Sequence, residues 1–185
     1  SIYAAYVVLC AIITSRLKFG KNIYEDDWDV LIVLDACRTD ALRRVEPEYD
    51  FLTDTESVWS RGSTSKEWIE RNFVEANRDQ VENTGYVTAN AFSHQLFQKG
   101  DQLTYPSINR TVFEGNAFLE SLVNDDVIDG EDFSHVEPMW GSSDIDDGFQ
   151  PTQHADVVTD HAIELHRQGE AGRMVVHYIQ PHAPY

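Results

Sequence analysis

The fold is decided by the stretch Trp28-Asp29-Val30-Leu31-Ile32-Val33-Leu34-Asp35-Ala36-Cys37-Arg38. Its five aliphatic residues, 30–34, do not alternate with polar residues, and such an unbroken run is typical of a strand covered on both faces in a parallel sheet. The residues that follow, 38–45, have helical spacing, so Asp35 lies between a strand and a helix. In open α/β sheets, this edge is where ligands bind.

The rest of the chain continues the alternation of strand and helix. Segments with strand or helix character are, in chain order, a strand at 56–60, a helix at 64–76, a strand at 85–89, a helix at 116–123, a helix at 153–167 and a strand at 173–179. The stretch 90–152 is otherwise rich in Asn, Asp, Gly and Ser, and we interpret it as loops around the sheet. The sequence therefore predicts an α/β fold with a mainly parallel sheet flanked by helices.

The N-terminus differs from this pattern. Residues 2–13 are an apolar run of about 12, shorter than the ~20 that a membrane-spanning helix needs. We expect residues 1–21 to form an apolar or amphipathic helix that faces the core, with the remnant of a signal or anchor segment as the alternative. Residues 22–185 then belong to the α/β domain, and no stable membrane span is expected.

The composition is strongly acidic. The 185 residues carry 32 Asp and Glu against 14 Lys and Arg, a formal net charge of -18. Nucleic-acid binding is excluded on this ground, because it requires clustered basic residues. An anionic surface with only four Lys fits a protein that stays soluble in concentrated salt, where screening removes self-repulsion, so we interpret the protein as halophilic. The two cysteines form no disulfide framework, and we expect a cytoplasmic location.

Polar residues follow three of the predicted strands. Asp35 is expected to bind a metal ion, because an unpaired carboxylate at the end of an aliphatic strand is costly; capping of the next helix is the alternative. His182 follows Pro181 on a stiff loop and is expected to contact a ligand. The carboxyl ends of parallel strands share one edge, so these side chains can converge on one ligand.

The third position is the cluster Ser63-Thr64-Ser65. Thr64 begins a capping box in which its hydroxyl and the carboxylate of Glu67 satisfy the first helical amides. The alternative is that Thr64 is a nucleophile, with the helix dipole stabilising an attached phosphoryl or sulfuryl group. Both readings stay open, and Ser63 and Ser65 are further candidate nucleophiles.

Three segments of the chain carry a resemblance to a known family: 28–38, Gly62-Ser63-Thr64-Ser65-Lys66-Glu67-Trp68 and His177-Tyr178-Ile179-Gln180-Pro181-His182-Ala183-Pro184-Tyr185. Together they resemble the sulfatase-like branch of the alkaline phosphatase superfamily, closest to sulfatase-like proteins of salt-loving archaea. The resemblance implies a metal-dependent hydrolase or transferase that acts on a small phosphate or sulfate ester through a hydroxyl nucleophile. It implies that Asp35 binds a divalent metal (Ca, Mn, Zn or Mg) and that Thr64 takes the covalent intermediate. It also implies that His182 and Arg38 contact the ester, although for Arg38 an ion pair with Asp40 or Glu67 is the alternative.

Two departures from the family pattern limit this expectation. The segment 64–68 lacks the Pro and Arg of the formylglycine signature, so no formylglycine is expected. The remaining family ligands come after the segment that ends at Tyr185, so we expect the 185 residues to be the N-terminal part of the domain and inactive alone. A non-catalytic sulfatase-like protein that binds a ligand or partner, with Thr64 only a helix cap, is the competing hypothesis.

Overall fold

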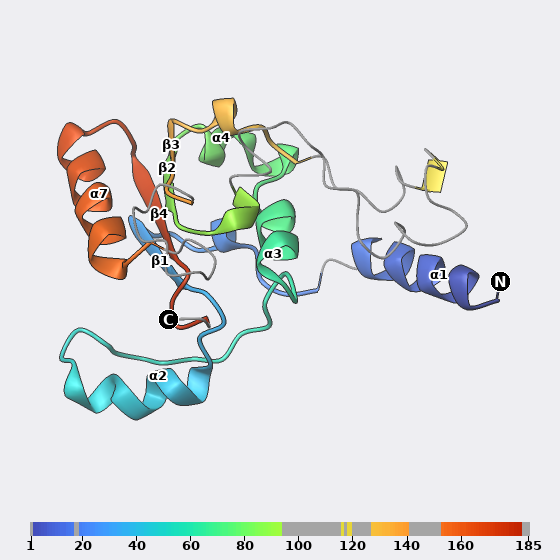
Figure 1. The fold of residues 1–185 in the computed structure, drawn as a ribbon, viewed down its shortest axis with the longest axis horizontal. Coiled ribbons are helices and arrows are strands. Elements are labelled where there is room, and N and C mark those ends of the chain that lie inside the picture. Colours follow the sequence, from blue (N-terminus) through green and yellow to red (C-terminus); the bar gives the residue numbers. More distant parts are fainter. Residues whose placement is uncertain are drawn as a thin grey trace, which may run out of the picture.

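A parallel β-sheet lies at the centre of the computed structural model, which describes residues 2–16, 19–93, 116, 118–119, 127–140 and 153–182. Its strands are β1 (Val30–Leu34), β2 (Thr84–Thr88), β3 (His135–Pro138) and β4 (Arg173–Tyr178). They are ordered β1-β4-β2-β3 and every neighbouring pair is parallel (Figure 1). The predicted α/β fold with a parallel sheet is confirmed.

The helices and turns connect these strands. Their bounds are α1 (Ile2–Arg16), α2 (Thr39–Val45), α3 (Ser65–Asn72), α4 (Arg78–Val81) and α7 (Ala155–Gln168), with short 3-10 helices at Ile23–Glu25, Glu46–Glu48, Glu75–Asn77 and Gly130–Asp132. Helix α7 ends at Gly169, whose φ of 70° is a left-handed conformation that glycine adopts without strain. The predicted helices at 38–45 and 153–167 therefore match α2 and α7 closely.

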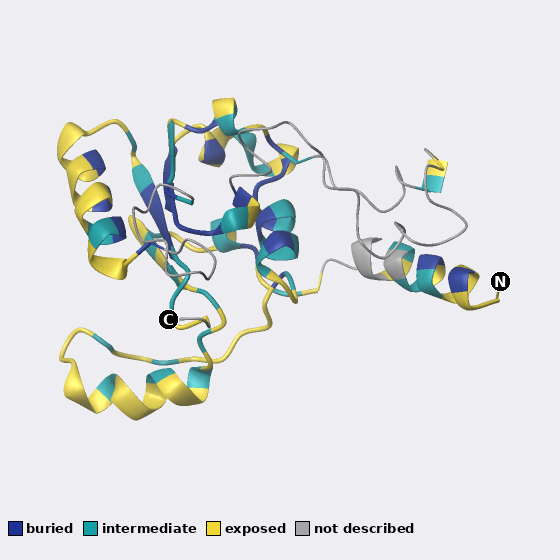
Figure 2. Cartoon of the chain, viewed as in Figure 1, coloured by how far each residue is buried: buried dark blue, intermediate teal, exposed yellow. Residues whose placement is uncertain are grey.

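Two apolar clusters cover the two faces of the sheet. On one face, α7 packs Val158 and Leu165 against Val87 of β2 and Val176 of β4. On the other face, Ile69 of α3 lies in a cluster with Phe73, Tyr86 and Val175, among others. Figure 2 shows the buried residues of both helices turned toward the sheet between them. The core thus covers both faces of β2 and β4, and this packing fixes the positions of the residues at the carboxyl ends of these strands.

Strand β1 differs from the prediction of a strand covered on both faces. Its residues alternate between intermediate and exposed, and Val30, Ile32 and Leu34 are 47%, 58% and 40% exposed. The reason is that Leu31 and Val33 pack on the cluster of one face, whereas the cluster under α7 on the other face includes residues of β2 and β4 and none of β1. The aliphatic run is a strand as predicted, but one of its two rows of side chains lies outside the cluster under α7 and is uncovered.

Four further predictions differ from the structure or fall outside it. Residues 56–60 form no strand; Ser60 makes only an isolated bridge with Lys21. The helix expected at 64–76 ends at Asn72, and strand β3 lies in the stretch interpreted as loops. Most of the helix expected at 116–123 lies outside the described residues.

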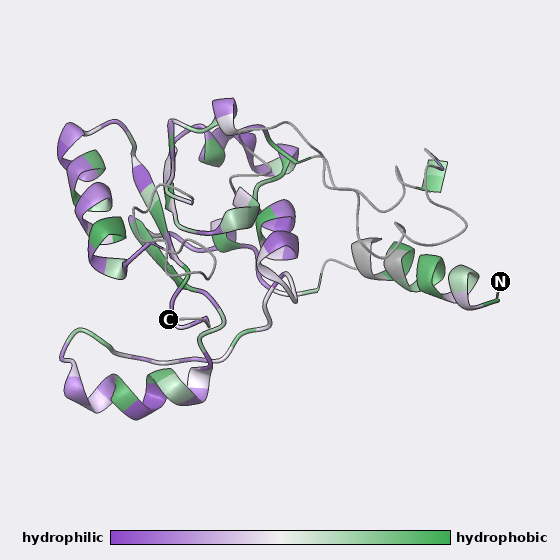
Figure 3. Ribbon diagram, viewed as in Figure 1, coloured by the Kyte–Doolittle hydropathy of each residue, from purple (hydrophilic) through white to green (hydrophobic). Residues whose placement is uncertain are grey.

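Helix α1 buries Ala4 and Val8, but neither residue belongs to the two apolar clusters of the sheet. Its large apolar residues Ile2, Tyr3, Tyr6 and Leu9 are all more than half exposed. Figure 3 shows it as an apolar helix that stands apart from the sheet. Within the part of the chain that the structure describes, no helix is long and apolar enough to cross a membrane.

Candidate functional site

A cavity of about 630 Å³ opens at the carboxyl end of β1. Residues 33–37 form one wall, and the loop and helix start at 62–65 form another. Trp68, Phe92 and two histidines complete the lining, which is Val33, Leu34, Asp35, Ala36, Cys37, Ser60, Gly62, Ser63, Thr64, Ser65, Trp68, Phe92, His177 and His182. The cavity lies at the edge where the sequence predicted a site.

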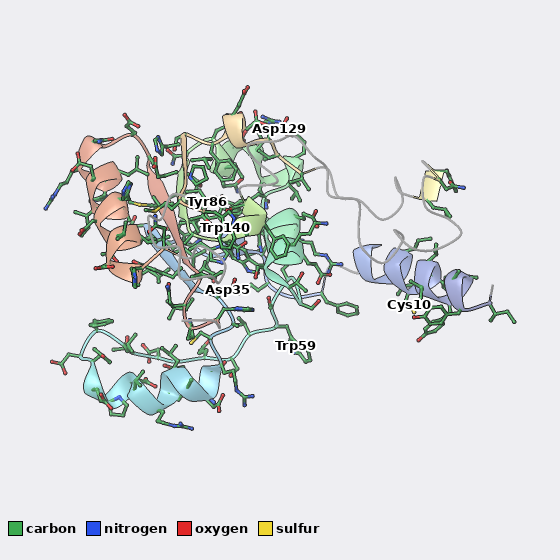
Figure 4. The ribbon with its side chains drawn as sticks, viewed as in Figure 1. Cys10, Asp35, Trp59, Tyr86, Asp129 and Trp140 are labelled. Carbon is green, nitrogen blue, oxygen red and sulfur yellow. The ribbon has the colours of Figure 1, made fainter. Side chains whose placement is uncertain are left out.

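Asp35 is the acidic residue of this cavity, and its side chain is 12% exposed. The Ser65 hydroxyl donates to both of its carboxylate oxygens, at 2.8 and 3.0 Å, and Asn90 Nδ2 donates to Oδ2 at 2.8 Å. The next residue, Ala36, has a φ of 57°, a conformation that costs a non-glycine residue about 1 kcal/mol or more. The backbone thus turns sharply after β1, and Asp35 lines the cavity at this point (Figure 4 labels Asp35).

His177 of β4 is the second titratable group beside Asp35, and it is 1% exposed. Its Nδ1 forms a hydrogen bond of 2.8 Å with the Tyr86 hydroxyl, and Trp68 packs edge-on against the ring. Nε2 lies 3.9 Å from Asp35 Oδ2. Burial lowers the pKa of His177 to about 4, and the nearby Asp35 charge offsets only part of this effect. The imidazole is therefore neutral at neutral pH.

The hydroxyl of Thr64 caps helix α3. Thr64 Oγ1 accepts a hydrogen bond of 3.2 Å from the Glu67 amide, which is the predicted first half of the capping box. The Glu67 carboxylate accepts from the Ser63 amide at 2.7 Å and from the Ser63 hydroxyl at 2.6 Å. It also pairs with Arg71 at 2.7 Å. Glu67 therefore ties down the loop before the helix, and the catalytic role of Thr64 stays a prediction.

Gly62 allows this loop to lie against α3. A Cβ atom at this position would overlap the backbone of Trp68. No residue other than glycine fits there without displacing the loop or the helix. The close approach brings the hydroxyls of Ser63, Thr64 and Ser65 to the cavity.

The other two predicted residues have different positions. His182 lines the cavity, and its amide donates to the Ile179 carbonyl at 2.9 Å, so its position agrees with a ligand-contacting role. Arg38 is not among the lining residues, and its side chain is 80% exposed. Its Nε forms an ion pair of 2.7 Å with Asp40, which is the alternative that the sequence left open. We therefore no longer place Arg38 at the site.

Two residues of the site were missed by sequence reasoning. His177 lies inside an aliphatic strand, where it reads as a core residue, and Asn90 lies two residues after β2 in a polar loop. The amide of Asn90 is fixed because its Oδ1 accepts from the Phe92 amide at 2.9 Å. The available signal was a polar residue at or near the end of a buried strand, the same signal that identified Asp35.

The charged side chain in the described lining of the cavity is acidic. The described lining contains the carboxylate of Asp35 and no Lys or Arg. No group of three or more His, Cys, Asp or Glu that could hold a metal ion occurs among the described residues. The Asp35 carboxylate and the neutral His177 imidazole nevertheless supply two donors of the kinds that divalent transition metals accept. The residues present thus fit part of a metal site.

Comparison of the chain with protein-family models, with curated proteins and with solved structures gives no match.

Proposed function

We propose that this protein is a metal-dependent hydrolase or transferase of phosphate or sulfate esters, of the sulfatase-like kind. The observation that carries the proposal is the hydrogen bond between the Ser65 hydroxyl and the Asp35 carboxylate, in a cavity at the start of helix α3. A hydroxyl on an acceptor carboxylate, next to a helix N-terminus, has the parts that group transfer to oxygen needs.

Binding of the ester depends on two features of the cavity. The N-terminus of α3 carries partial positive charge that favours an anionic group. A divalent metal held by Asp35, when bound, would neutralise charge on the transferred group and lower the pKa of the attacking hydroxyl. His182, at the cavity wall, would contact the ester oxygens.

Ser65 is the preferred nucleophile. As its Oγ forms a bond to phosphorus or sulfur, the hydroxyl proton passes to Asp35, and the bond between the leaving oxygen and that atom breaks. The leaving alcohol then takes up the proton, and water or a second alcohol cleaves the covalent intermediate in the same way. Thr64, one residue earlier, is the second candidate, but its oxygen already accepts the amide hydrogen of Glu67.

The competing function is ligand binding without catalysis. The specific observation in its favour is the cap that Thr64 makes on α3, because a structural role accounts for this residue without any chemistry. In that case the cavity binds an ester or another ligand and releases it unchanged.

Turnover assays separate the two functions. The protein expressed from its own gene is incubated with p-nitrophenyl phosphate, bis-p-nitrophenyl phosphate and p-nitrophenyl sulfate in concentrated salt with Mn²⁺, Zn²⁺ or Ca²⁺. We expect metal-dependent release of p-nitrophenol that falls at least about 100-fold in Ser65→Ala. Thr64→Ser, which keeps a capping hydroxyl, is the control and retains activity. Absence of turnover with every substrate supports the binding function.

A further inference from the structure

The strongest unexplained feature of the cavity is a ring nitrogen of His177, a residue of the cavity lining. His177 is 1% exposed, yet its Nε2 has no hydrogen-bond partner among the residues that the structure describes. The ring lines the cavity together with Asp35, whose Oδ2 lies 3.9 Å from Nε2. An imidazole nitrogen that is open to the cavity and lies beside a carboxylate can take a cation as a shared ligand.

We propose that His177 and Asp35 are two protein ligands of one divalent transition-metal ion, held between strands β4 and β1 inside the cavity. The inference rests on the proposed function, because it assigns an additional ligand to the metal that this function requires. His177 was given no such role from its place in the sequence.

The distance between the two donor atoms agrees with a shared ion. With metal–ligand distances of about 2.0–2.2 Å, two donors on one ion lie about 3–4 Å apart, depending on the angle between them. The observed 3.9 Å lies near the upper end of this range, so a small movement of the two side chains would bring the donors to the separation of about 3.4 Å that a tetrahedral ion needs. Parallel pairing opposes Val33 to His177, so the sheet itself holds the imidazole next to the end of β1.

Tyr86 can fix the ring in the orientation that a metal ligand needs. Metal-binding histidines usually donate their other N–H to a fixed acceptor, which sets the tautomer. The hydroxyl oxygen of Tyr86 lies 2.8 Å from Nδ1 and can accept that hydrogen, which leaves the lone pair on Nε2 facing Asp35. Tyr86 is itself fully buried and stacked with Phe133, so this arrangement is rigid.

The donor types indicate which ions would bind. One imidazole and one carboxylate suit Mn²⁺ or Zn²⁺ better than Ca²⁺, which prefers oxygen ligands. Two protein ligands leave coordination positions for water and for an ester oxygen. The cavity therefore accommodates a metal and an anionic substrate together.

Metal binding is measured on the protein expressed from its own gene, in concentrated KCl, by titration with Mn²⁺ and detection of free Mn²⁺ by electron paramagnetic resonance. We expect His177→Gln and Asp35→Asn each to weaken Mn²⁺ binding at least about tenfold. His154→Gln, which is exposed at the start of α7 and outside the cavity lining, is the control and keeps the wild-type affinity.

A spectroscopic readout keeps the test valid if His177→Gln fails to fold. In the wild-type protein, electron spin-echo modulation of bound Mn²⁺ is expected to show one directly bound imidazole nitrogen, and this signal persists in His182→Gln. Bound Mn²⁺ without a nitrogen signal, or a signal lost in His182→Gln, overturns the assignment of His177 while the proposed function stands. Ester turnover that continues in the presence of a strong chelator overturns both.

Discussion

Strands β1 and β4 are neighbours of similar composition, but only one of them is buried. They pair in parallel from Val30 opposite Met174 to Leu34 opposite Tyr178, and both are rich in aliphatic residues. Residues 174–177 of β4 are buried without interruption, whereas β1 alternates between intermediate and exposed residues. An aliphatic run therefore specifies a strand, while the helices that pack on each face of the sheet decide whether that strand is covered.

The candidate site takes one acid–base group from each strand. Asp35 follows the exposed strand, and His177 lies within the buried one. The two groups therefore have different surroundings: Asp35 accepts hydrogen bonds from neutral donors at the cavity wall, and His177 is enclosed by Tyr86 and Trp68. The first two of the following experiments measure how far the difference between the two strands extends.

The largest effect is expected from acid titration of metal-free protein. His177 has a pKa of about 4 when folded, below its ordinary value near 6.5, so the unfolded chain binds more protons between these pH values. The contribution of neutral His177 to the free energy of unfolding is therefore fully present above pH 6.5. This contribution decreases by about 3 kcal/mol as the pH falls toward 4. We expect His177→Gln to lose less stability than wild type over this window in urea unfolding at each pH.

The control for this titration is His154→Gln, because His154 is exposed and precedes α7. Acid also protonates carboxylates throughout the chain, so only the difference between the two variants reports on His177. Equal loss of stability in both variants between pH 6.5 and 4 would contradict a neutral buried imidazole.

The next largest effect is expected from the same substitution, Val to Ala, made once in each strand and compared by its cost in free energy of unfolding. Val175→Ala in β4 removes two methyl groups from a side chain with no exposed surface and is expected to cost about 2 kcal/mol. Val30→Ala in β1 makes the same change at a position 47% exposed and should cost less than about 1 kcal/mol. Denaturant unfolding measures both, and similar losses would show that β1 is covered in solution.

The pattern of the sequence was sufficient for β1, β2, β4, α2 and α7, because long periodic segments depend mainly on local residues. It was insufficient for β3, His135–Pro138, where four residues that include His, Glu and Pro have no strand-like pattern. The residues of the candidate site also include one that the sequence pattern predicted and one that it did not. Asp35 followed from its place at a strand end, but His177 required knowing that the first and last strands are neighbours, in a register that opposes Val33 to His177.

A smaller effect is expected at the loop that lines the cavity. Gly62→Ala places a methyl group against the backbone of Trp68, and we expect a loss of about 1–2 kcal/mol because the loop or α3 must shift. Gly169→Ala is the matched control for strain without crowding, since its φ is 70° and no atom lies within 4 Å of the added Cβ. Ligand binding should weaken only in Gly62→Ala, and unchanged binding there would argue that the loop does not shape the cavity.

The smallest effect on stability separates the two hydroxyls at the start of α3. Thr64→Ala removes the cap on the Glu67 amide and is expected to cost about 1 kcal/mol in denaturant unfolding. Thr64→Ser restores the capping oxygen and should recover most of that loss. Ser65→Ala removes no cap, but it takes one of the donors from the Asp35 carboxylate, so its stability cost should be smaller than its effect on turnover. If Thr64→Ala instead abolishes turnover while Ser65→Ala leaves it intact, the nucleophile is Thr64, and the cap must open during the reaction.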